Sequence, residues 1–106
     1  MHRIQRPTLA DRELQYRVAL ELLEQIKSRF SFLTSTAFGA LRLQGRRRCV
    51  EIHAIDGEVR LVGRVESDGD KRAVEESAPR VAGVRQVIAH IQVDRAPNRR
   101  FQPTWN

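Results

Sequence analysis

The chain has 106 residues and a formal net charge of +6 at pH 7, which is the size of one domain. Hydrophobic residues make up 41% of it and charged residues 30%, a composition that excludes fibrous and disordered proteins. The single cysteine, Cys49, excludes an internal disulfide and a multi-cysteine zinc site. No apolar run approaches the roughly 20 residues of a membrane-spanning helix, and the first residues lack a secretory signal. We therefore expect a cytoplasmic domain, which could also lie peripherally on a membrane, with no cofactor.

The positive charge lies mostly outside the predicted core. Residues 1–10 form a basic extension, residues 42–48 hold four arginines and no acid, and residues 94–106 form a basic tail expected to be flexible. The stretch between the last two carries more acidic than basic side chains. This layout suits attraction to phosphate on lipid or nucleic acid, and solubility alone would explain it equally well.

Residues 8–30 have the spacing of one amphipathic helix, because Leu14, Val18, Leu22 and Ile26 recur every four residues. Thr8 or Asp11 can cap its start. Residues 31–48 show no clear period and are too apolar for a free linker. They predict a loop folded back on the core, and a short helical turn or an early strand within it both stay open.

Alternating residues predict a β-hairpin over 50–65, with its turn at Asp56-Gly57. A second helix is expected from Ser67 to about Val81, with a kink or an early end at Pro79. A last strand spans Arg85 to Val93. This order predicts an α+β domain over residues 11–93, with a three-stranded mixed sheet and both helices on one face.

Two stretches of the chain carry a family resemblance. Residues 50–67 contain Val59-x-Leu61-x-Gly63-x-Val65, and residues 81–93 contain Gly83-Val84-x-x-Val87. Together they resemble the BON domain, a small bacterial module first described in osmotically inducible and nodulation proteins, and the likeness extends over about residues 11–93.

The glycines of these motifs have structural readings. Gly57 supplies a turn with positive φ, Gly63 leaves room for a helix to approach the sheet, and Gly83 ends the second helix. The motifs therefore indicate an architecture and not an active site.

The candidates for chemistry are few. His53 and His90 are expected on the outer sheet face and could hold a metal if their strands are neighbours, but no third ligand is evident beyond Glu51. Cys49 beside Arg48 could be a low-pKa thiol, although no base accompanies it. The chain has no phosphate-cradling glycine loop and no serine nucleophile elbow. We expect neither an enzyme nor a metal site.

The resemblance implies a non-enzymatic binding module. Our first hypothesis is association with anionic phospholipid through Arg42, Arg46, Arg47 and Arg48, with Phe38 and Leu41 inserting beside the headgroups. The alternative is a protein-interaction or self-association module that uses an open sheet edge. Nucleic-acid binding through the basic segments ranks third, because the chain lacks the glycine loop of KH domains and the aromatic sheet motifs of RNA-recognition domains.

Overall fold

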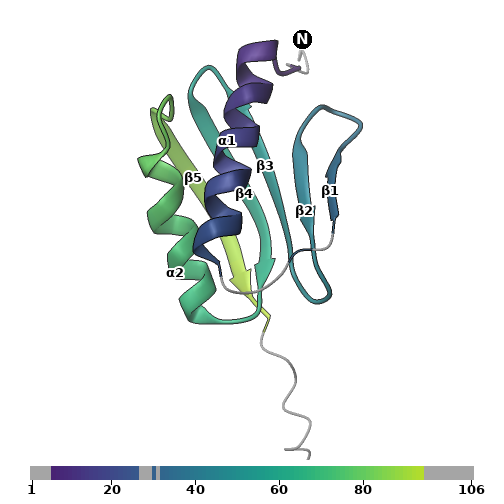
Figure 1. Cartoon of the computed structure of the whole chain (residues 1–106), viewed down its shortest axis with the longest axis vertical. Helices are drawn as coiled ribbons and strands as arrows, with labels where there is room; N and C mark the ends of the chain where they lie inside the picture. Colours follow the sequence, from purple (N-terminus) through teal and green to yellow (C-terminus); the bar gives the residue numbers. More distant parts are fainter. Residues whose placement is uncertain (1–5, 27–29, 31, 95–106) are drawn as a thin grey trace, which may run out of the picture.

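A computed structural model describes residues 6–26, 30 and 32–94. Within these residues the chain forms two α-helices, one 3-10 turn and a five-stranded sheet in the order β1-β2-β3-β4-β5. The elements are α1 (Leu9–Gln25), β1 (Phe32–Ser35), β2 (Leu41–Gln44), β3 (Cys49–Ile55), β4 (Glu58–Val65), α2 (Asp68–Ser77), η1 (Ala78–Arg80) and β5 (Gln86–Val93). Neighbouring strands are antiparallel, except that β4 and β5 are parallel. Figure 1 shows α1 and α2 side by side in front of the sheet.

The α+β class with two helices is confirmed, but the predicted three-stranded sheet is wrong. The segment read as a loop contains the β1–β2 hairpin, which adds two strands beside β3. Thr36 closes this hairpin: its hydroxyl accepts hydrogen bonds from the N–H groups of Phe38 and Ala40, and Gly39 adopts a positive φ of 90°. Of the alternatives that the sequence left open for residues 31–48, the early strand is confirmed, but the segment forms two strands and not one.

The core lies between the sheet and the two helices. The even residues of β3 and the odd residues of β2 and β4 point toward the helices, which leaves the other sheet face without a helix in the described structure (Figure 1). The buried residues of α1 include all four that the helical spacing selected, Leu14, Val18, Leu22 and Ile26. The β-strand residues that are fully buried against them are Val50, Ile52, Ala54, Val59, Leu61 and Val65.

The start of α1 is fixed by a reciprocal cap. Thr8 is the N-cap and Asp11 completes the capping box, so each of the two candidate caps has a part in it. Pro7, just before the cap, is buried. The helix ends at Gln25, five residues before the predicted end, because Ile26 adopts an extended conformation.

The predicted β3–β4 hairpin is confirmed, and its turn has positive φ at both Asp56 (54°) and Gly57 (86°). Gly63 lies on the helix side of β4, but the prediction that it leaves room for a helix is wrong. A Cβ on Gly63 would overlap the backbone carbonyl of Cys49 on β3, so the close approach is between two strands.

Pro79 ends the second helix early. α2 stops at Ser77, and Pro79 lies in the 3-10 turn that follows, since its ring is compatible with the first positions of a new turn. The prediction that Gly83 ends the second helix is wrong, because α2 stops at Ser77. Gly83, with a φ of 99°, lies in the turn between η1 and β5, where it redirects the chain into the last strand.

Candidate functional site

The most basic stretch of the described chain is the β2–β3 turn, residues 45–48. Gln44 and Cys49 pair across it, and the N–H of Gly45 donates to the carbonyl of Arg48 at 2.8 Å. These bonds tie down both ends of the turn and leave Arg46 and Arg47 exposed at its tip. Two guanidinium groups are thus presented to solvent by a short, backbone-braced turn.

An open groove of about 830 Å³ lies beside this turn, and we call it the arginine groove. It combines the turn with the helix-free face of β2, β3 and β4. Its lining residues are Arg42, Gln44, Arg46, Arg47, Arg48, Cys49, Glu51, Val62, Gly63, Arg64 and Asp94. Five arginines against two carboxylates leave it positively charged, and all four arginines chosen from the sequence line it.

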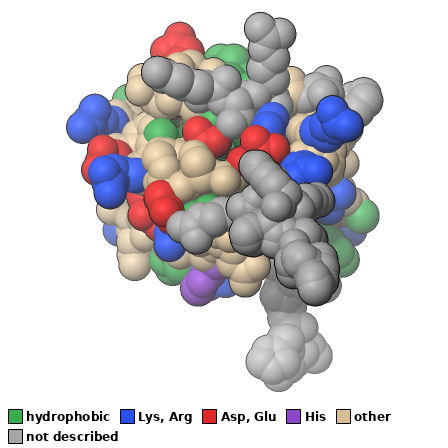
Figure 2. All heavy atoms as spheres, turned by 90° about the horizontal axis from the view of Figure 1, so that it is seen from below, with side chains coloured by type: hydrophobic (Ala, Val, Ile, Leu, Met, Phe, Trp, Pro, Cys, Tyr) green, Lys and Arg blue, Asp and Glu red, His purple; other side chains and the backbone are tan. Residues whose placement is uncertain are grey.

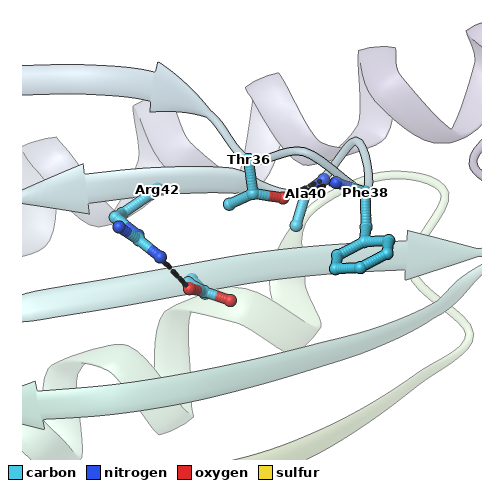
Figure 3. Close-up of polar contacts among 5 residues, drawn as sticks. Thr36, Phe38, Ala40 and Arg42 are labelled. Atoms are coloured by element: carbon cyan, nitrogen blue, oxygen red, sulfur yellow. Dashed lines mark hydrogen bonds and ion pairs between the residues drawn. The ribbon is translucent and has the colours of Figure 1, made fainter.

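Arg42 is neutralised by its neighbour on β3. Its Nη2 donates to Glu51 Oε2 at 2.6 Å, and its Nε donates to the same oxygen at 3.2 Å. Figure 3 shows the pair from the helix-free side of the sheet, with the helices behind the strands. Because the two residues face each other across the β2–β3 ladder, the pair follows from strand register.

Arg48 also lines the groove, but its partners differ from those of Arg42. Its Nη2 lies 2.8 Å from Glu66 Oε1, its side chain is 11% exposed, and its guanidinium lies 6.0 Å from the centre of the Phe30 ring. The predicted cluster is therefore divided: Arg42 and Arg48 are each paired with a carboxylate, and Arg46 and Arg47 are exposed at the tip of the turn.

Arg64 is a member of the groove that the sequence did not select. It lies opposite Cys49 on β4, and its Nη1 is 3.5 Å from Asp94 Oδ2. The sequence could have predicted this position, because a two-residue turn at Asp56-Gly57 fixes the β3–β4 register and so places Arg64 opposite Cys49. Asp94, which also lines the groove, is the last described residue of the chain.

The apolar partners proposed for these arginines do not lie beside them. Leu41 is 4% exposed and belongs to the core. Phe38 is 58% exposed, but it lies in the β1–β2 turn (Figure 3), at the opposite end of β2 from Arg46 and Arg47. Four strand residues separate the two turns, roughly 13 Å. The prediction that Phe38 and Leu41 insert beside the arginine run is wrong.

The chemistry that the described residues of the groove offer is charge and hydrogen bonding. Burial raises the pKa of the Cys49 thiol, against a smaller opposing effect of Arg42, so the low-pKa alternative is wrong. His53 lies on β3 and His90 on β5, with β4 between them, so their strands are not neighbours. Among the described residues no three His, Cys, Asp or Glu side chains are grouped to hold a metal.

The charge at the end of the molecule seen from below is mixed. In Figure 2, lysine and arginine side chains gather at the two sides of this view, with acidic side chains between them. A polyanion that approached this end would therefore not meet a uniformly basic surface. No helix in the described residues is both long and apolar enough to cross a membrane.

Comparison with known families agrees with the sequence motifs. Residues 46–95 match the family model of the BON domain, from the tip of the β2–β3 turn through β3, β4, α2 and β5. This match supports the assignment of the segment to the BON domain family, a family of non-catalytic modules. The match begins at Arg46, so α1 and the β1–β2 hairpin lie outside it. No curated protein and no solved structure matches the chain.

Proposed function

We propose that this protein is a non-enzymatic binding module that associates with anionic phospholipid surfaces through the arginine groove. The observation that carries the proposal is the pair Arg46 and Arg47, exposed at the tip of a turn braced by the Gly45–Arg48 hydrogen bond. A tip can reach a planar surface of headgroups without the rest of the sheet having to approach it. Arginine suits the task, because its guanidinium forms bidentate hydrogen bonds with phosphate oxygens.

The energetic scale of such a contact is modest. Each arginine near an anionic membrane contributes about 1 kcal/mol, so Arg46 and Arg47 together contribute about 2 kcal/mol, or roughly 30-fold in partitioning. Arg42 and Arg48 contribute less, since each already interacts with a carboxylate. Binding should weaken steeply with salt, because the two exposed side chains at the tip are both charged.

Co-sedimentation with vesicles tests the proposal. The wild-type chain should pellet with phosphatidylserine-containing vesicles at physiological salt and remain in the supernatant with neutral phosphatidylcholine. The double variant Arg46→Ala/Arg47→Ala should bind about 30-fold more weakly. Arg72→Ala/Arg80→Ala is the matched control, because it removes the same charge from exposed positions on α2 and η1.

Three outcomes would contradict the proposal. The wild type could fail to pellet at physiological salt, it could bind neutral vesicles equally well, or the two double variants could lose the same affinity. Tight binding to DNA or RNA without lipid binding would favour the third hypothesis instead.

A further inference from the structure

In the described structure β5 forms the edge of the sheet opposite β1, and it pairs along its whole length with β4 on its inner side. Two backbone hydrogen bonds show which residues of β5 face β4. The N–H of Gln86, the first residue of β5, donates to the carbonyl of Gly57, and the N–H of Asp94, just after β5, donates to the carbonyl of Val65. In a parallel ladder alternate residues face the neighbour, so the even residues of β5 bond to β4. The N–H and C=O groups of Val87, Ala89, Ile91 and Val93 therefore point outward.

This edge lacks the features that normally prevent strand addition. Natural edge strands are shortened, bulged, or marked by charged residues or proline. β5 is eight residues long and pairs with β4 in continuous register. Its sequence, Gln-Val-Ile-Ala-His-Ile-Gln-Val, contains one histidine but no lysine, arginine, acidic residue, glycine or proline. Charged residues form 30% of the whole chain, so their absence from the edge strand is a local feature.

We propose that β5 pairs antiparallel with β5 of a second copy, so that the two sheets become one continuous sheet about a two-fold axis. The pairing that uses all four outward-facing residues places Val87 opposite Val93 of the second copy and Ala89 opposite its Ile91, and His90 then lies on the axis. Each backbone group that points outward receives a partner. No two like charges face each other in this register, because β5 carries none.

The same register also selects the occupant. A second β5 presents the same four outward-facing residues and no charged residue, so the contact is self-complementary about the two-fold axis.

The position of His90 on the axis makes it the residue that tests the proposed register. In the proposed register two exposed His90 side chains face each other on the helix-free side, where Arg60 and Arg64 of β4 lie diagonal to them. The nearest carboxylate on that face, Glu51, lies beyond Val62 on β3. A cation introduced at residue 90 of both copies would place two positive charges on the axis among these arginines, so it should weaken the dimer.

Sedimentation equilibrium of the full chain without lipid tests the proposal. Wild type should show a monomer–dimer equilibrium at pH 7.5. His90→Lys and His90→Glu should each weaken the dimer at least tenfold, and mixing the two variants should restore a heterodimer. His53→Lys, on the same face but on the interior strand β3, should leave the dimer intact.

The proposal would be overturned by a wild type that stays monomeric at all concentrations, or by a His90→Lys variant that dimerises as well as wild type. Equal weakening by His53→Lys would also overturn it. Restoration on mixing shows that the variants are folded, so loss of dimer cannot be attributed to misfolding. The arginine groove takes no part in these measurements, so its function stands or fails separately.

Discussion

The side chain of Gln15 on α1 accepts the backbone hydrogen bond of Ala54 on β3 that a neighbouring strand would otherwise accept. β2 begins at Leu41, opposite Ile52, so the backbone N–H of Ala54 extends past the end of its neighbour. Gln15 Oε1 accepts that N–H at 3.0 Å, and its Nε2 donates to the carbonyl of Gly39 at 2.9 Å. One fully buried amide thus joins the helix to β3 and to the β1–β2 turn.

Replacing Gln15 with methionine should destabilise the domain by about 2–3 kcal/mol. The substitution keeps the volume but leaves the buried N–H of Ala54 and carbonyl of Gly39 without partners, and each unsatisfied group costs about 1–3 kcal/mol. Urea denaturation followed by circular dichroism measures the change. Gln25→Met is the control, because Gln25 is exposed at the end of the same helix and bonds Glu21; it should change stability by less than about 0.5 kcal/mol. Equal effects of the two variants would refute the role assigned to Gln15.

Asp11 should make stability depend on pH below about pH 5. Burial acts to raise the pKa of this carboxyl, but hydrogen bonds from the backbone N–H groups of Thr8 and Asp56 outweigh it and hold the pKa below 3.8. Because the pKa is lower in the folded chain, the contribution is fully present above the unfolded pKa and is lost as pH falls through the folded pKa.

Asp11→Asn is the variant that isolates this contribution. It should cost about 1–2 kcal/mol at pH 7, and the difference from wild type should shrink as pH falls from about 5 to 3. Denaturation curves at several pH values measure it. A difference that stays constant across that range would show that the charge of Asp11 does not contribute.

Gly63→Ala should be among the most damaging single-methyl additions to the sheet. The added Cβ would overlap the carbonyl of Cys49, and a paired backbone cannot move aside as a flexible side chain can. We expect a loss of about 3 kcal/mol by thermal or urea unfolding. Gly69→Ala offers the opposite control, since a Cβ there meets nothing closer than Ser67 Oγ at 3.8 Å, and alanine in α2 should be neutral or stabilising by up to about 1 kcal/mol. A Gly63→Ala variant as stable as wild type would mean that β3 and β4 can separate locally.

The contrast between the two hairpins explains which parts of this fold could be read from the sequence. β3 and β4 alternate over seven and eight residues around a turn that demands positive φ, so both pattern and turn chemistry point to one answer. β1 and β2 have four residues each, too few for alternation to stand out, and their turn is closed by the Thr36 side chain. That hairpin is specified by its packing beside β3, which a local pattern does not reveal.

The candidate site was predictable in composition but not in arrangement. The basic run of residues 45–48 predicted Arg46 and Arg47 as site residues, and both are exposed because they lie in a turn. The pairing of Arg42 with Glu51 and of Arg48 with Glu66 depends on strand register and on the direction each side chain takes from the sheet. The same register, once known, adds Arg64 to the groove.

Glu51→Gln should strengthen binding to anionic vesicles by releasing Arg42. The Arg42–Glu51 pair is partly exposed, with 42% and 38% of the side chains accessible, so its loss should change stability by no more than about 1 kcal/mol. The freed guanidinium faces the arginine groove and should add about 1 kcal/mol to membrane binding, roughly fivefold in the partition coefficient. Glu75→Gln on α2 makes the same change in net charge away from the groove and should have a much smaller effect. If both variants raise binding equally, the attraction comes from total charge and not from this site; if Glu51→Gln leaves binding unchanged, Arg42 takes no part in it.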